Sequence, residues 1–91
     1  MSLDIKFTSQ FKKDLKIAKN QNRHMDKLFA TIEKLANEEI LEPKFCDHAL
    51  IGNYSGYREC HIEPDWLLIY TVKNDVLTLV LYRIGSHSQL F

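Results

Sequence analysis

Two stretches of the chain gather residue types that are suited to acid–base chemistry. The stretch "RECHIEPDWLLIY" carries His61 and Asp65, and the C-terminal stretch "RIGSHSQLF" carries Arg83 and His87. Imidazoles exchange protons near neutral pH, a carboxylate can orient an imidazole, and a guanidinium holds two phosphate oxygens in its planar fork. If the fold brings the two stretches together, they would form one site for acid–base chemistry on a phosphate ester.

These residues also have ordinary structural interpretations. His61 could cap a strand end, and Arg83 could form an ion pair with Glu59 or Asp65, since paired arginines are common at strand ends. Trp66 is more typical of a core than of a contact with nucleic acid, although one indole can serve both purposes. The sequence leaves these alternatives open.

The cysteines and histidines lack the spacing of a metal site. Cys46 and His48 form a C-x-H pair and Cys60 and His61 form a C-H pair, whereas zinc ligand pairs usually have two or more residues between them. We therefore expect neither a metal nor another cofactor. The two cysteines are expected to be reduced thiols, because a lone pair without an export signal seldom forms a disulfide.

The first elements that must position the site are a strand and a helix. "LDIKF" alternates apolar and polar residues, which predicts a short N-terminal strand. Thr8 or Ser9 can cap the helix that follows. Its apolar residues, Phe11, Leu15 and Ala18, have the i, i+4, i+7 spacing of one helical face.

A second helix follows the polar "NQN" segment. Its apolar face is made by Met25, Leu28, Phe29, Ile32, Leu35 and Ala36. Because the link between the two helices is short, we expect a helical hairpin. From Asn37 to Gly56 the periodicity disappears, and glycines and a proline indicate a loop.

Three β-like runs complete the chain, at Tyr57–Ile62, Trp66–Val72 and Val76–Ile84. The connections "EPD" and "KND" are tight, so the runs should form an antiparallel meander. We expect an α+β fold in one domain, residues 1–91, with the N-terminal strand and the meander in one sheet and the helices on one face.

Side-chain alternation in the last run would put Leu77, Leu79, Leu81 and Arg83 on one face. His61 can then approach Arg83 only if the strand registers align.

Charge and hydropathy restrict the class of protein. At 91 residues and net charge zero, the chain does not coat nucleic acid by bulk electrostatics. No apolar run approaches the ~20 residues of a membrane helix, and the N-terminus is too polar for a secretory signal, so we expect a cytoplasmic protein. Basic charge is concentrated in the first helix, where Lys12, Lys16, Lys19 and Arg23 form one stripe. This stripe is either a solvated face or a phosphate contact.

The segments "DHALIGNYSGYRECHIEPDWLLIY" and "YRIGSHSQLF" resemble the YafQ-like branch of the RelE/ParE toxin superfamily. The resemblance covers essentially the whole chain and implies a RelE-like fold. In that family, the positions implicated in RNA cleavage match His48, His61, Asp65, Arg83 and His87. The positions that match Trp66 and Phe91 hold RNA or shape the site.

The resemblance implies an mRNA interferase, the toxin of a type II toxin–antitoxin system. Cleaving RNA without a metal requires a base for the 2′-hydroxyl, an acid for the leaving 5′ oxygen and a cation for the phosphate. We expect His87 to be the acid and Arg83 the cation, with either His61 or Asp65 as the base.

The implied partners are messenger RNA, free or on the ribosome, and a cognate antitoxin, with a monomeric free toxin that forms a hetero-oligomer with the antitoxin. Lys12, Lys16 and Lys19 could contact RNA phosphates or an acidic segment of the antitoxin. The alternative function is that of a ParE-like toxin, which binds and poisons DNA gyrase without cleaving RNA.

Overall fold

A five-stranded β-sheet organises residues 2–91, the part of the chain that this computed structural model describes. In spatial order its strands are β1 (Asp4–Phe7), β5 (Thr78–Gly85), β4 (Trp66–Lys73), β3 (Arg58–Glu63) and β2 (His48–Ala49). β1 runs parallel to β5, and all other neighbouring strands are antiparallel. The predicted α+β fold, with its N-terminal strand and its three-stranded meander, is confirmed.

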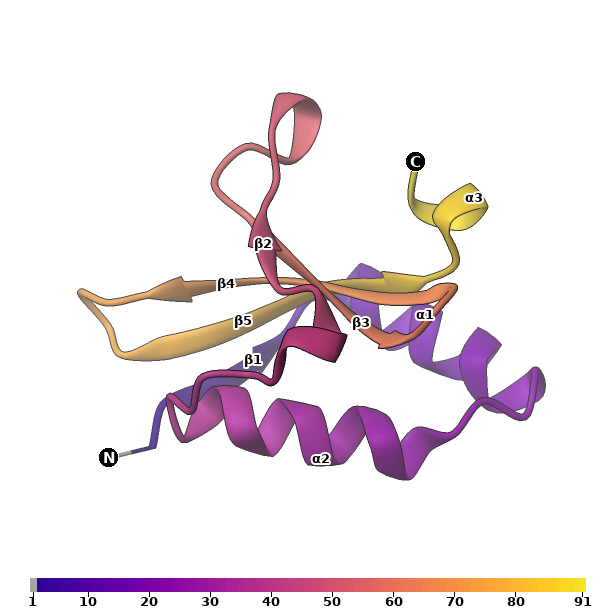
Figure 1. Cartoon of the computed structure of the whole chain (residues 1–91), viewed down its shortest axis with the longest axis horizontal. Coiled ribbons are helices and arrows are strands. Elements are labelled where there is room, and N and C mark those ends of the chain that lie inside the picture. The colour runs from indigo at the N-terminus through magenta and orange to yellow at the C-terminus, as the bar shows by residue number, and fades with distance from the viewer. Residues whose placement is uncertain (1) are drawn as a thin grey trace.

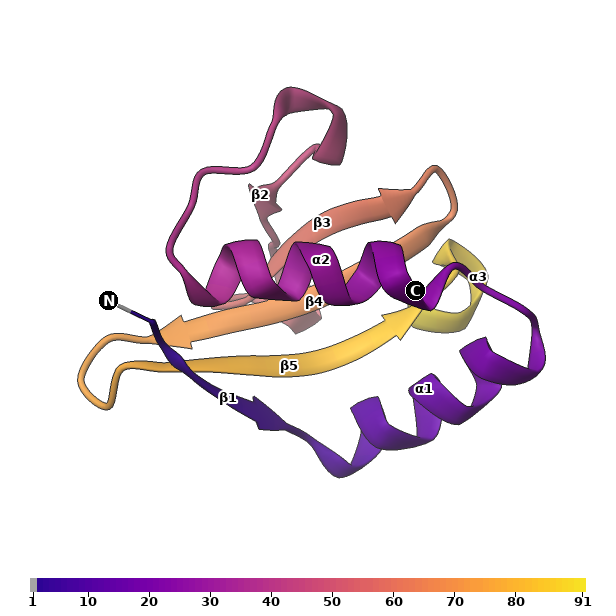
Figure 2. The same ribbon diagram turned by 90° about the horizontal axis from the view of Figure 1, so that it is seen from below.

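Two helices, α1 (Ser9–Asn20) and α2 (Met25–Ala36), cover one face of the sheet (Figure 1). Figure 2 shows α2 lying over the middle of the sheet and α1 beside the end of β5. Thr8 caps α1, as predicted, because its hydroxyl accepts a hydrogen bond from the backbone N–H of Phe11 at 3.0 Å. Within residues 2–91, the opposite face of the sheet, called the outer face below, carries no long helix.

The alternation of β4 explains its nearly continuous apolar sequence. Trp66, Leu68 and Tyr70 pack into the core beneath the helices. Leu67 and Ile69 belong to a smaller cluster on the outer face. Both faces of this central strand are therefore buried.

The predicted loop between residues 37 and 56 contains short elements that the sequence did not reveal. They are the 3-10 turns η1 (Pro43–Phe45) and η2 (Gly52–Tyr54), with the two-residue strand β2 between them. A strand this short has no alternation to detect. After β5, the tail also forms a short helix, α3 (His87–Leu90). A capping box between Ser86 and Gln89 stabilises its N-terminus.

The prediction that Leu77, Leu79, Leu81 and Arg83 share one face is wrong. Leu77 lies in the turn before β5 and has φ +47°, so it is not part of the strand. A register shift then places Leu81 opposite Tyr70 but Arg83 opposite Ile69, with one extra residue in β5. This β-bulge turns Arg83 to the outer face, away from the core leucines.

In the part of the chain that the structure describes, no helix has the length and hydropathy needed to cross a membrane.

Candidate active site

The strand register brings the two chemistry-bearing stretches onto the outer face. Two successive rows of residues cross β3, β4 and β5 there: Glu59, Ile69 and Arg83, followed by His61, Leu67 and Gly85. Residues directly opposite each other in a sheet project to the same side. His61 and Arg83 therefore share one face, one row apart, and α3 carries His87 back over it.

His87 is held by Asp65, which lies in the turn between β3 and β4. The Nδ1 atom of His87 lies 2.7 Å from Asp65 Oδ1, and the backbone N–H of His87 donates to the same oxygen at 3.0 Å. These two hydrogen bonds, first from the backbone and then from the ring, hold the pKa of Asp65 below its usual range. The carboxylate thus stays ionised and fixes the orientation of the His87 ring.

Glu59 is a nearly buried carboxylate between two histidines. Its side chain is 7% exposed, and its two oxygens lie 3.2 Å from His48 Nε2 and 3.7 Å from His61 Nε2. His48 Nδ1 faces the backbone oxygen of Cys46. Both nitrogens of His48 therefore face acceptors, and both contacts are hydrogen bonds only when the ring carries both hydrogens.

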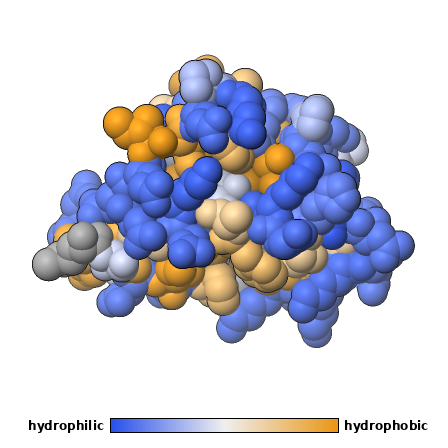
Figure 3. All heavy atoms as spheres, turned by 60° about the horizontal axis from the view of Figure 1, so that its bottom comes forward, coloured by the Kyte–Doolittle hydropathy of each residue, from blue (hydrophilic) through white to orange (hydrophobic). Residues whose placement is uncertain are grey.

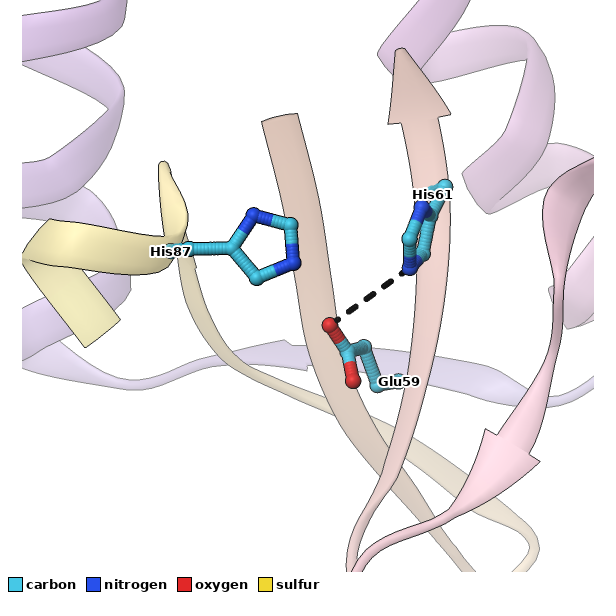
Figure 4. A group of neighbouring side chains, drawn as sticks. All are labelled: Glu59, His61 and His87. Atoms are coloured by element: carbon cyan, nitrogen blue, oxygen red, sulfur yellow. Dashed lines mark ion pairs between the residues drawn. The ribbon is translucent and has the colours of Figure 1, made fainter. Parts of the chain in front are cut away.

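His61 and His87 lie side by side above Glu59 (Figure 4). Their ring centroids are 5.8 Å apart, and the rings meet edge to face. One ligand-type atom from each of Glu59, His61 and His87 lies within 4.8 Å of the other two. The structure thus places two imidazoles, each with its own carboxylate, on either side of one small space.

Arg83 is bound by a carboxylate that the sequence did not suggest. Its Nε and Nη2 donate to the two carboxylate oxygens of Asp14, at 3.1 Å each. Hydrogen bonding to Asp14 raises the pKa of Arg83 and keeps it charged. The alternative of a structural ion pair with Glu59 or Asp65 is wrong, because α1 supplies the partner. Asp14 engages two of the five guanidinium N–H groups, so others can bind a ligand.

The comparisons with known proteins agree with this geometry. The family model described as "Bacterial toxin of type II toxin-antitoxin system, YafQ" matches residues 3–91. This chain belongs to the YafQ toxin family.

Three relatives show how closely the chain follows the YafQ family. The mRNA interferase toxin YafQ of Escherichia coli K12 is 38% identical over 89 residues, which cover 97% of this chain and 95% of that protein. The E. coli DinJ–YafQ toxin–antitoxin complex matches with TM-score 0.90 and 37% identity over 100% of this chain and 99% of that one. A metal-bound toxin from Helicobacter pylori matches with TM-score 0.92 and 44% identity over 98% of this chain and 99% of that one.

Trp66 and the lysines of α1, which were also candidates for contact with RNA, lie apart from the histidines and Arg83. Trp66 is 1% exposed within the core, and the Arg23 guanidinium lies 5.6 Å from its ring centroid. Of the two roles that the resemblance implied for Trp66, this burial agrees with shaping the site rather than with holding RNA. The stripe of Lys12, Lys16 and Lys19 is exposed on α1 and makes none of the contacts described for the site.

Phe91 lies at the rim of an aromatic cluster on the outer face. Phe91 is 61% exposed, and its ring meets Tyr54 edge to face with the centroids 5.2 Å apart. The Tyr54 hydroxyl donates to the backbone oxygen of Leu90 at 2.6 Å and so holds α3 against the sheet. Tyr57 stacks on Tyr82 with the centroids 4.5 Å apart. Phe91 therefore both anchors the tail and leaves an aromatic surface open.

Asp14 and Glu59 are the two residues of this site that sequence reasoning missed. Asp14 is the single acid among the lysines of α1 and lies on the same helical face as Phe11 and Ala18. Its position on this apolar face was the one sign in the sequence that it would be buried. Glu59 is buried although it looked like an ordinary strand glutamate. A carboxylate at a core position is costly unless it is paired, so each of these two required partners.

Glu59, His61 and His87 could also hold a divalent metal ion. Carboxylate oxygen and imidazole nitrogen are ligands that Zn²⁺ accepts, and three such atoms lie close enough to share one ion. This group differs from the cysteine and histidine pairs considered from sequence. Cys46 and Cys60 are both free thiols, as predicted.

Proposed function

We propose that this chain is an mRNA interferase, the toxin of a type II toxin–antitoxin pair. The observation that carries the proposal is the pairing of His61 and His87 on one face, with ring centroids 5.8 Å apart and one carboxylate beside each ring. The mRNA interferase toxin YafQ of E. coli, at 38% identity, supports it. Two imidazoles supply the base and the acid that transesterification of RNA requires.

The reaction needs no metal in this mechanism. His61 accepts the proton of the 2′-hydroxyl as its oxygen attacks phosphorus, and the bond to the 5′ oxygen breaks. His87 gives its proton to that leaving oxygen. Arg83 binds the non-bridging phosphate oxygens through the N–H groups that Asp14 leaves free. The products are a 2′,3′-cyclic phosphate and a 5′-hydroxyl.

Between the two candidate bases, we favour His61. Asp65 Oδ1 already accepts two hydrogen bonds from His87, and its lowered pKa makes it a weak proton acceptor. Asp65 then acts by orienting the acid. His48 acts indirectly, because it contacts Glu59 and so holds that carboxylate beside His61.

We further propose that a cognate antitoxin silences this toxin. The support is the E. coli DinJ–YafQ toxin–antitoxin complex, in which the YafQ chain has the same fold. The exposed stripe of Lys12, Lys16 and Lys19 offers basic charge to an acidic segment of such a partner. We propose that the toxin acts in the cytoplasm, on free or ribosome-bound mRNA. We further propose that residues 1–91 form one domain and that the toxin is a monomer when no antitoxin is bound.

Gyrase poisoning, the alternative function, draws no support from the site. A toxin that acts by binding alone needs neither an acid nor a base, whereas this site places a carboxylate beside each of His61 and His87.

End mapping of a cleaved RNA tests the proposal. Purified protein is incubated with a defined RNA in EDTA, with and without ribosomes. We expect fragments with 5′-hydroxyl and 2′,3′-cyclic or 3′-phosphate ends. RNA that stays intact under both conditions would contradict the proposal.

A further inference from the structure

A groove of about 660 Å³ lies between α2 and the end of β3. One wall is α2 with Lys27 and Lys34, and the other wall is η1 with Lys44 and Phe45. The end of β3 and the turn after it, from His61 to Pro64, complete the lining. Figure 3, which shows the helix-covered side, has apolar side chains lying in hollows between hydrophilic ones.

Three lysines and one aromatic ring dominate this groove. Lys27 and Lys34 lie two turns apart on α2, or about 10 Å along the helix, and Lys44 faces them from η1. The Phe45 ring is half-buried, with the Lys34 and Lys44 ammonium groups 5.7 and 5.6 Å from its centroid. The groove therefore offers positive charge on both walls and an aromatic surface between them.

The carboxylates near these lysines do not neutralise the groove strongly. Lys27 lies 3.8 Å from Glu63, and Lys34 lies 3.8 Å from Glu42. The side chains of Lys27 and Lys34 are 57% and 40% exposed. Ion pairs this exposed contribute little to stability and are easily exchanged. A phosphate group can therefore take the place of either carboxylate.

We propose that this groove binds the RNA strand next to the cleaved phosphodiester. Lys34 and Lys44 contact phosphates, and a base stacks against Phe45. Cationic walls with an aromatic ring are the usual means of holding single-stranded nucleic acid. His61 lines both the groove and the candidate active site. Because β2 pairs only with Arg58 and Glu59 of β3, an RNA strand can pass His61 around the edge of β3, from the outer face into the groove.

This inference rests on the proposed function, because it assumes that RNA is the substrate. An acidic segment of an antitoxin would be attracted by the same lysines. The aromatic ring between the lysines and the shared His61 favour RNA.

The test measures binding of two RNAs that cannot be cleaved because every 2′-hydroxyl is methylated. One is a dinucleotide, which covers only the cleavage site, and the other is an octanucleotide. The proteins are the wild type, the double variant Lys34→Gln/Lys44→Gln, the single variant Phe45→Leu, and the control Lys6→Gln/Lys73→Gln. The control changes two exposed lysines that do not line the groove.

We expect the double variant to bind the octanucleotide about 10-fold more weakly than the control does. The slope of log affinity against log salt should become shallower by about 1.4, since each lost phosphate contact on a single strand contributes about 0.7. Phe45→Leu keeps an apolar side chain but removes the ring, and should weaken binding about 10-fold, because the base loses the aromatic surface on which it stacks. Dinucleotide binding should match that of the wild type in all variants.

Three outcomes would overturn the groove assignment. The first is equal octanucleotide affinity and salt slope for the double variant and the control. The second is loss of antitoxin binding by the groove variants without loss of RNA binding, which would assign the groove to the antitoxin. The third is a wild type that does not bind the octanucleotide. A wild type that binds RNA through the groove but never cuts a cleavable RNA contradicts only the proposed function.

Discussion

Arg83 in β5 and Asp14 in α1, 69 residues apart in the chain, are joined by two hydrogen bonds of 3.1 Å. Asp14 also accepts the backbone N–H of Ile84 at 3.1 Å, beyond the point where β1 stops pairing with β5. One nearly buried carboxylate thus caps the open edge of the strand and fixes the guanidinium on the outer face. The helix that covers the core thereby positions a residue of the candidate site.

Replacing Asp14 with Ala should therefore damage both stability and activity. The change leaves Arg83 and the Ile84 N–H without their acceptor, and breaking a buried pair of this kind costs about 3–5 kcal/mol. Urea unfolding measures the loss, with the exposed Asp26→Ala as a matched control. Under conditions in which the variant remains folded, RNA cleavage should still be reduced, because Arg83 is no longer fixed. A variant as stable as the control would contradict the role of Asp14.

The carboxyl group of Asp65 should titrate below the ~3.9 of an ordinary aspartate. Its pKa is lowered by hydrogen bonds from the backbone and ring of His87. A lowered pKa in the folded state means that these bonds stabilise the fold above the unfolded pKa. Their contribution disappears as the pH falls through the folded value. NMR titration of the side-chain carboxyl carbon measures the midpoint, which should rise only part of the way to the ordinary value in His87→Ala, because alanine keeps the backbone N–H and removes only the ring. An ordinary midpoint in the wild type would show that the contact is absent in solution.

Zinc ions should inhibit cleavage rather than support it. A metal bound by Glu59, His61 and His87 would occupy the imidazoles that exchange protons. Removing one ligand typically weakens a metal site, so Glu59→Gln should raise the half-inhibitory zinc concentration about 10-fold. Each protein is compared with its own rate in EDTA, and Glu63→Gln serves as the control on the same strand. Stimulation of the wild type by zinc would contradict the metal-free mechanism.

Charge reversal on α1 should slow binding of the antitoxin. Changing Lys12, Lys16 and Lys19 to Glu replaces attraction with repulsion, and rim charges act mainly on the association rate. Stopped-flow measurement at low salt should show about a 10-fold lower rate constant, and high salt should reduce the difference. The matched control changes Lys6, Lys13 and Lys73, which are exposed but lie off the stripe. Equal rates for the two triple variants would remove the stripe from the partner interface.

The fold could largely be predicted from the sequence because its elements have clear periods. The apolar spacing of α1 and α2 is that of a helical face, and the apolar runs of β4 and β5 are short, rich in β-branched and aromatic residues and bounded by turns, which favours strands. The bulge that turns Arg83 to the outer face has no such signature. It arises from pairing between strands, and alternation along β5 alone predicts the wrong face.

The candidate site could be predicted only in part, because its histidines and arginine are recognisable by type but their carboxylate partners are not. Which acid pairs with which base depends on the register of β3, β4 and β5 and on the approach of α1. Asp14 and Glu59 therefore became visible only in three dimensions. The proximity of His61 and His87 likewise depends on α3, a four-residue helix that the sequence did not reveal.

The most direct test of the mechanism is the rate at which a His87→Gln variant cleaves an RNA whose 5′-bridging oxygen is replaced by sulfur. On normal RNA the variant should be slower by about 10²-fold or more, the typical loss when a general acid is removed. Sulfur leaves without being protonated, so the modified RNA should restore much of the variant's rate, whereas His61→Gln should stay slow on it. A His87→Gln protein that cuts normal RNA at the wild-type rate, or that gains nothing from the sulfur substrate, would contradict the assignment of His87 as the acid.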